Sequence, residues 1–242
     1  MEGHFFRSVT QFLEARHLLE SFVINAPERF LRPFRPGKII ALGRNYAAHA
    51  AETGHDAPKE PIIFSKSPES CIGPEEPIRI DPTVGRVDPE AELGVVIARK
   101  ARNVAPEEAD IVIAGYTLVN DVTARDMQAN DIKQGHPWFR SKSLDTFGPL
   151  GPVIALPDAM PSPLEVDIEL RVNGEVRQKS NTTKMIFKVP ELVAYISRYV
   201  TLLPGDLIST GTPEGIAPIQ PGDMVEVTVP QIGTLRNPVT PA

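Results

Sequence analysis

Proline constrains the fold of this chain more than any other residue type. The 242 residues include 25 prolines. Proline fixes φ and lacks a backbone N–H, so it interrupts helices and is excluded from most central strand positions. The prolines divide the chain into many short segments, which favours strands and turns over long helices. We therefore expect a mostly β (α+β) domain with a few short helices.

The apolar, β-branched segments have the lengths of strands. They lie at 38–43, 61–66, 77–80, 91–98, 113–120, 152–156, 164–172, 207–211 and 223–229. The dipeptide Asn173-Gly174 separates 166–172 from 175–180. Asn-Gly between two such segments is the strongest short-range signal of a β-hairpin. We therefore predict an antiparallel hairpin at this place.

Two helices are predicted among these strands. One covers 190–200, because Pro190 suits a first helical turn and apolar residues follow at helical spacing. A shorter one begins near Asp121 or Val122 and runs through Gln128. Residues 5–22 carry a rough helical stripe of apolar side chains. We interpret 1–35 as an N-terminal appendage and 36–242 as the main, catalytic domain.

Charge and cysteine content restrict the partners and the compartment. The net charge is −6, which argues against a nucleic acid or an anionic membrane surface as partner. Cys71 is the single cysteine, so no internal disulfide forms and a reducing compartment is the default. No apolar stretch reaches the roughly 20 residues of a membrane span. Glu2, Glu14 and Glu20 argue against a transit peptide. We expect a cytoplasmic protein.

Three carboxylates are set at strand spacing. Glu90 and Glu92 stand at the start of the apolar segment 91–98, and in a strand they project to the same side. Two such acids repel each other unless a proton or cation lies between them. Asp121 ends a second apolar segment and can complete a three-oxygen site, which suits Mg²⁺ or Mn²⁺. The alternative is a solvated strand edge without function.

Two further groups of residues have chemistry that is compatible with such a metal site. If a helix begins at Asp121, then Arg125 and Gln128 share its face, and Arg125 can oppose a substrate carboxylate or a developing oxyanion. A surface Asp–Arg pair is the alternative.

His49 and Glu52 lie three apart in an alanine-rich segment that is typical of a lightly anchored, mobile lid. The carboxylate would fix the histidine tautomer and leave a base near neutral pH. Exposed helix residues are again the alternative.

Two loops complete the set of candidates. Lys142 lies in a stretch rich in glycine and proline, where its ammonium can reach a substrate oxygen. Thr212 lies in 209–216 between glycine-flanked turns, whose backbone N–H groups can hold a carboxylate. A surface lysine and a plain turn are equally compatible with these patterns.

These segments together resemble the fumarylacetoacetate hydrolase family. The resemblance covers residues 38–239 and is carried, in order, by 38–52, 88–97, 115–128, 141–152, 173–178, 209–216 and 233–237. It implies a β-rich sandwich or roll, usually a homodimer, with Mg²⁺, Mn²⁺ or sometimes Ca²⁺. It also implies site residues: Glu90, Glu92 and Asp121 as metal ligands, His49 and Glu52 as the base pair, Lys142 as a further catalytic residue, and Arg125, Gln128 and Thr212 as substrate contacts.

The chain departs from the larger founding hydrolases of that family. Those have an extra N-terminal domain and a fourth metal carboxylate just before the catalytic histidine, whereas 38–45 contains no acid. The chain is more similar to short members: acylpyruvate hydrolases, oxaloacetate decarboxylases and 2-hydroxyhepta-2,4-diene-1,7-dioate isomerases. The expected function is metal-dependent C–C cleavage of a small 2-oxo or 2,4-dioxo acid through an enolate held at the metal. The alternatives are isomerisation of a 2-hydroxy-diene-dioate in aromatic catabolism and non-catalytic dicarboxylate binding.

Overall fold

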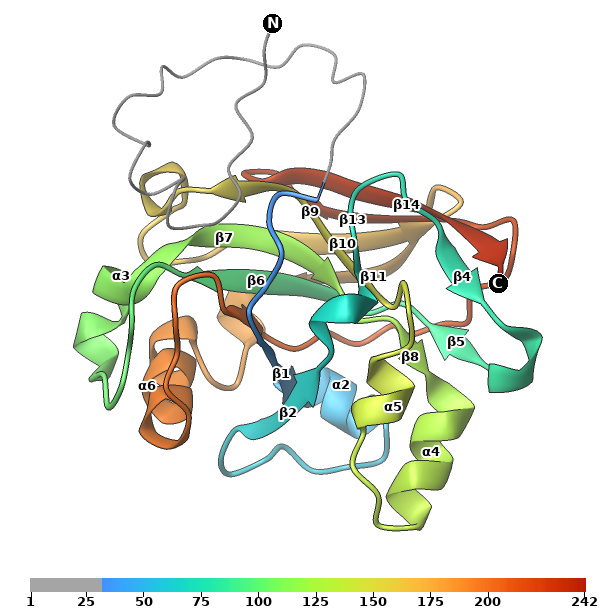
Figure 1. Cartoon of the computed structure of the whole chain (residues 1–242), viewed down its shortest axis with the longest axis horizontal. Coiled ribbons are helices and arrows are strands. Elements are labelled where there is room, and N and C mark those ends of the chain that lie inside the picture. Colours follow the sequence, from blue (N-terminus) through green and yellow to red (C-terminus); the bar gives the residue numbers. More distant parts are fainter. Residues whose placement is uncertain (1–31) are drawn as a thin grey trace, which may run out of the picture.

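A seven-stranded mixed sheet forms one layer of the protein (Figure 1). The computed structural model describes residues 32–242, so the helical stripe expected at 5–22 lies outside the described residues. The sheet order is β2-β1-β12-β6-β7-β9-β3. The strands are β1 (Ile39–Gly43), β2 (Ile62–Lys66), β3 (Cys71–Ile72), β6 (Ala91–Ile97), β7 (Ile113–Asn120), β9 (Gly148–Ala155) and β12 (Leu207–Ser209). Every residue of β6 and β7 is buried, which explains their nearly continuous apolar sequences.

A five-stranded sheet, in the order β11-β10-β13-β14-β4, forms the second layer. Its strands are β4 (Ile78–Ile80), β10 (Asp167–Val172), β11 (Glu175–Asn181), β13 (Met224–Val229) and β14 (Gly233–Pro241). Asn173 and Gly174 have φ values of 54° and 81° and join β10 to β11. Two consecutive positive φ angles match the two-residue turn that Asn-Gly favours, so the predicted hairpin is confirmed. Leu93 and Leu118 from the first sheet share one hydrophobic core with Leu170 and Val227 from the second.

The helices are short and most of the 3₁₀ turns start at proline. The helices are α2 (Ala47–Glu52), α3 (Ala109–Val112), α4 (Arg125–Lys133), α5 (Phe139–Lys142) and α6 (Val189–Tyr199), and the 3₁₀ turns are Pro68–Ser70, Pro82–Val84, Pro106–Glu108, Pro157–Ala159 and Thr182–Lys184. A two-stranded ribbon pairs β5 (Val87–Asp88) with β8 (Thr123–Ala124). The expected mostly β architecture is confirmed, and α6 confirms the helix predicted at 190–200 to within a residue. In the described part of the chain, no helix combines the length and the apolar character of a membrane span.

The start of the second helix was predicted wrongly. Helix α4 begins at Arg125, and Asp121 lies outside it. The Asp121 N–H donates to the Glu90 carbonyl at 2.9 Å, and Thr123–Ala124 pair with Val87–Asp88. This extended pairing overrides the local helical preference of the segment. Asp121 therefore does not share a helical face with Arg125 and Gln128.

Strand β14 was absent from the sequence-based expectations. Pro238 and Pro241 lie within it, and prolines argue against a strand. Its pairing with β13 on one side and β4 on the other forms the strand nevertheless. Helices α2, α4 and α5 lie together beside β1 and β2, at one end of the molecule (Figure 1). The candidate side chains gather there.

Candidate active site

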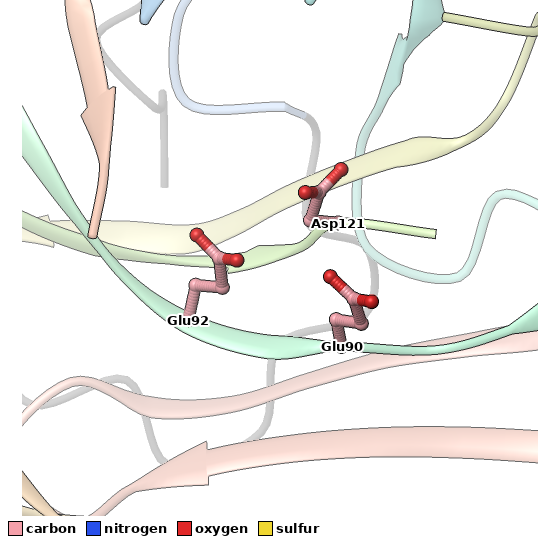
Figure 2. A group of neighbouring side chains, drawn as sticks. All are labelled: Glu90, Glu92 and Asp121. Atoms are coloured by element: carbon pink, nitrogen blue, oxygen red, sulfur yellow. The ribbon is translucent and has the colours of Figure 1, made fainter. Parts of the chain in front are cut away.

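Three buried carboxylates lie close together where β6 and β7 are paired. Glu90 directly precedes β6 and Glu92 is its second residue, and Figure 2 shows both side chains on the same side of the strand. Asp121 directly follows β7, whose Asn120 pairs with Ala91 of β6. One oxygen from each acid lies within 4.8 Å of the others. The three residues are at most 3% exposed, so the alternative of a solvated strand edge is excluded.

The cluster fits a divalent cation by its chemistry. It offers hard oxygen donors at short mutual distances, which is what Mg²⁺ and Mn²⁺ prefer. Burial, together with the Asp121 carboxylate, raises the pKa of Glu92 to about 8. Ionisation of all three acids near neutral pH therefore needs further positive charge beside Glu92. The Asp121 Oδ1 already faces the Lys66 ammonium, with 2.8 Å between Nζ and Oδ1. A divalent cation at this place would supply the positive charge that Glu92 lacks.

Two buried lysines compensate the other acids. Lys142, the last residue of α5, places Nζ 2.7 Å from Glu90 Oε2 and 2.6 Å from Asp121 Oδ2. Burial alone would lower its pKa, but Asp121 and Glu90 raise it. Lys66, the last residue of β2, has Nζ 2.8 Å from Asp121 Oδ1 and donates to the Lys142 carbonyl. Burial lowers the pKa of Lys66.

Sequence reasoning missed Lys66 and misplaced Lys142. A lysine that ends an apolar segment is usually a solvent-exposed strand end, so 61–66 gave no signal of a buried cation. Lys142 was expected in an open loop where it would reach a substrate. It is instead helical and 3% exposed, with both closest carboxylates belonging to the protein.

Arg125 is anchored by protein groups on three sides. Its Nε donates to Asp88 Oδ2 at 2.8 Å, one terminal nitrogen donates to Gln128 Oε1 at 2.7 Å, and the other pairs with Glu90. Although burial opposes ionisation of Glu90, Lys142 and Arg125 hold its pKa below the usual range. Because the Gln128 oxygen accepts from Arg125, the Gln128 amide nitrogen remains to donate elsewhere. Asp88 is fully buried and was not among the sequence-based candidates.

His49 and Glu52 meet on α2 as their spacing predicted. His49 Nδ1 lies 3.3 Å from Glu52 Oε2, and His49 is 6% exposed. This burial excludes the alternative of an exposed helix residue for His49, whereas Glu52 is partly open to solvent. The Gly215 N–H donates to both Glu52 oxygens, at 3.1 and 3.2 Å. The imidazole is thereby connected to the loop after β12, which sequence reasoning had not linked to it.

The loop after β12 supports the triad and continues to Thr212. The Ser209 hydroxyl and the Gly211 N–H both donate to Glu92 Oε2, at 2.6 and 2.8 Å. Thr212 follows directly and is 3% exposed. The segment 209–212 therefore connects a candidate metal ligand to a candidate substrate contact.

Most of the candidate residues line a single pocket. They are His49, Glu90, Glu92, Arg125, Gln128, Lys142 and Thr212. Asp121 contacts the pocket-lining Lys142, and Glu52 contacts the pocket-lining His49. The remaining wall contains Arg44, whose guanidinium lies 5.8 Å from the Trp138 ring centre, and the exposed His55. Acids, cations and an imidazole therefore surround one space that a small anionic molecule can enter.

Comparison with known proteins gives consistent matches over this region. The family model described as fumarylacetoacetate (FAA) hydrolase C-terminal matches residues 38–240. An uncharacterised protein of Pyrococcus abyssi is 50% identical over 205 residues, which are 85% of this chain and 91% of the relative. The mitochondrial oxaloacetate tautomerase of Xenopus laevis is 43% identical, over 84% of this chain and 66% of its own.

Two solved structures are similar to the whole described fold. A 5-carboxymethyl-2-hydroxymuconate delta-isomerase from Mycobacterium smegmatis has a TM-score of 0.80 and 46% identity, covering 88% of this chain and 82% of its own. A fumarylacetoacetate hydrolase from Exiguobacterium antarcticum has a TM-score of 0.84 and 36% identity, covering 97% and 88%.

Proposed function

The chain belongs to the fumarylacetoacetate hydrolase family, and on this premise we propose that it moves a proton on the carbon next to the keto group of a small 2-oxo acid. The proposed reaction is a metal-dependent keto–enol tautomerisation or double-bond isomerisation. The observation that carries it is one pocket lined by His49, the acidic triad and Lys142. The tautomerase and isomerase named above are similar to this chain and support the same reaction class.

Glu90, Glu92 and Asp121 are the residues that would hold Mg²⁺ or Mn²⁺. When bound, the ion would act as a Lewis acid that lowers the energy of the enolate of a chelating 2-oxo acid. Lys142 and Lys66 place positive charge 2.6–2.8 Å from the Glu90 and Asp121 carboxylates, and Lys142 helps to hold the pKa of Glu90 below its usual range. Ionised carboxylates are the form in which these residues ligate a cation.

His49 is proposed as the base that removes and returns the substrate proton. Glu52 lies on its Nδ1, so it favours the tautomer with the proton there and stabilises the imidazolium that forms. The Gly215 N–H holds the Glu52 carboxylate in place. The Gln128 amide nitrogen, oriented by Arg125, is left to donate to developing negative charge. A single such donor contributes roughly 2.7–4 kcal/mol in well-studied oxyanion sites.

The experiment is a substrate panel with and without metal. Purified protein is given oxaloacetate, acetylpyruvate and a 2-hydroxy-diene-dioate in Mg²⁺ or in excess EDTA, and loss or gain of the enol is followed by ultraviolet absorbance. We expect turnover only with metal. The variant His49→Ala should lose roughly 10²–10⁴-fold in rate with unchanged Mg²⁺ binding. The control His136→Ala removes an exposed imidazole that does not line the pocket, and it should remain near wild type.

A separate variant tests the ligand set. Glu92→Gln should weaken Mg²⁺ binding in calorimetry and reduce turnover together. Unchanged Mg²⁺ affinity in this variant would remove the proposed metal centre. Full activity in EDTA, or of His49→Ala, would remove the proposed mechanism.

Carbon–carbon cleavage, the first expectation from the sequence, is the second candidate. The similarity to a structure named as a hydrolase favours it. In this reaction the C3–C4 bond breaks, and C4 leaves either as CO₂ or, after attack on its carbonyl by a water from which His49 takes a proton, as a carboxylic acid. The remaining pyruvate enolate takes up a proton at C3 and leaves as pyruvate. Pyruvate release from oxaloacetate or acetylpyruvate distinguishes cleavage from tautomerisation. Metal binding without turnover of any compound would indicate a non-catalytic dicarboxylate-binding protein.

The homodimer expected from the resemblance is part of the same proposal. Sedimentation of the purified protein at several concentrations tests it, and a mass near that of a single chain would contradict it.

A further inference from the structure

Gln178, a residue of the five-stranded sheet, connects the segment that carries Glu90 and Glu92 to the loop that carries Thr212. It lies in β11 and is 1% exposed. Its Oε1 accepts from the Ala91 N–H at 2.8 Å, between Glu90 and Glu92. Its Nε2 donates to Thr212 Oγ1 at 2.9 Å and to the Pro213 carbonyl at 2.7 Å. One amide therefore contacts two segments that carry candidate site residues.

The orientation of this amide follows from its two backbone partners. A backbone N–H can only donate and a backbone carbonyl can only accept, so the oxygen of Gln178 must face Ala91 and its nitrogen must face Pro213. The nitrogen then also faces Thr212, whose hydroxyl oxygen has to accept. The hydroxyl keeps one hydrogen of its own, and among the described residues no acceptor takes it. Thr212 is 97% buried and lines the pocket. Its unused hydrogen is therefore available to a pocket occupant.

The backbone around Gln178 holds the loop in this position. The pairing Leu170–Gln178 is followed by Arg171–Val176, so Arg177 is an extra residue in β11. Such a bulge bends a strand and redirects its side chains. Gly215 packs on this bulge so closely that a Cβ there would lie 2.1 Å from the Arg177 carbonyl oxygen. The loop from Thr212 to Gly215 thus rests on rigid backbone as well as on the amide.

We propose that Gln178 is a positioning residue that makes the Thr212 hydroxyl a hydrogen-bond donor to the carboxylate of the substrate. The ligand class is a small oxo acid, so the inference rests on the proposed function. Thr212 touches the substrate, and Gln178 acts through it. Gln178 also fixes the Ala91 N–H, which couples the strand of Glu90 and Glu92 to the same loop.

The test is a double-mutant cycle with oxalate as the probe. Gln178→Glu keeps an acceptor for Ala91 but replaces the donor, so the Thr212 hydroxyl turns its hydrogen toward Glu and away from the pocket. Binding of oxalate in saturating Mg²⁺ is measured by calorimetry. We expect Gln178→Glu and Thr212→Val each to weaken binding roughly tenfold to a hundredfold, as for loss of a hydrogen bond to a charged group. The double variant should bind oxalate no more weakly than Thr212→Val alone.

Controls separate positioning from general damage. Gln220→Glu adds the same charge at an exposed position and should leave oxalate binding unchanged. Thr212→Ser keeps the donor and should bind like wild type, and this comparison with Thr212→Val decides the matter if Gln178→Glu does not fold. Additive losses in the cycle, unchanged binding by Gln178→Glu, or equal losses for Ser and Val would each overturn the proposal.

The outcome is distinguishable from that of the proposed function. A chain that binds oxalate with the expected coupling but turns over no substrate would keep the role of Gln178 and lose the enzymatic activity. Normal turnover of a substrate together with additive losses in the mutant cycle would keep the enzymatic activity and lose the role of Gln178. A wild-type chain that binds no oxalate would overturn both.

Discussion

Replacement of Gly215 by alanine tests whether the loop after β12 positions the His49–Glu52 pair. Gly215 and Gly222 both have φ values of +100°, a region that side chains rarely adopt. At Gly215 a Cβ would lie 2.1 Å from the Arg177 carbonyl oxygen, whereas at Gly222 no atom lies within 4 Å. Gly222→Ala is therefore a matched control, in which the backbone strain is the same and the collision is absent.

The expected magnitude follows from the difference between the two sites. A left-handed conformation costs an ordinary residue roughly 1–2 kcal/mol at either position, so this contribution cancels. The atoms that meet the new Cβ at Gly215 are backbone atoms, so the loop itself has to move. Movement breaks the hydrogen bonds from the Gly215 N–H to the Glu52 carboxylate. A hydrogen bond to a charged group contributes about 1.5–3 kcal/mol.

Gly215→Ala should therefore unfold about 3–12 °C below Gly222→Ala, since 1 kcal/mol shifts Tm by about 2–4 °C in a chain of this size. Its kcat should fall about tenfold or more, because about 1.4 kcal/mol corresponds to a factor of ten in rate. Thermal unfolding by calorimetry and steady-state kinetics on the active panel compound measure the two effects. Equal Tm values for the two alanine variants, or an unchanged kcat for Gly215→Ala, would show that this loop does not position Glu52.

Three further predictions concern other parts of the chain. Arg44 lines the pocket and has no ion-pair partner among the described residues, so it is free to bind the second carboxylate of a substrate. Arg44→Ala should therefore raise KM for oxaloacetate roughly tenfold to a hundredfold, and it should leave KM for acetylpyruvate, which lacks a second carboxylate, nearly unchanged. Asn45 makes three hydrogen bonds to the backbone of Phe187 and Thr210, so Asn45→Ala should lower the unfolding free energy by about 3 kcal/mol in denaturant titrations, and a loss below about 1 kcal/mol would contradict this account. Burial raises the pKa of the Cys71 thiol to about 11, so iodoacetamide at pH 8 should label the native protein at least about 100-fold more slowly than the urea-unfolded chain, and comparable rates would mean that Cys71 is accessible.

Local chemistry made part of the site predictable. The side-by-side projection of Glu90 and Glu92 follows from strand alternation, and the contact of His49 with Glu52 follows from helical spacing. Both relations involve residues at most three apart in the sequence. The helix expected from Asp121 failed for the opposite reason, because pairing of Thr123–Ala124 with Val87–Asp88 determines that segment. The structure nevertheless brings Asp121 to the other two acids through the pairing of β6 with β7.

Most of the strands, helix α6, the Asn-Gly hairpin and the residue types that meet in the pocket could be predicted from the amino-acid sequence. These features were predictable because hydrophobic periodicity, turn chemistry and proline act over a few neighbouring residues. The burial of Lys66 against Asp121 and the connection of Ala91 to Thr212 through Gln178 were not predictable, because they depend on how distant segments pack. These contacts join residues that are 34 or more positions apart. The order of strands in two packed sheets brings them together, and no local pattern of side chains records that order.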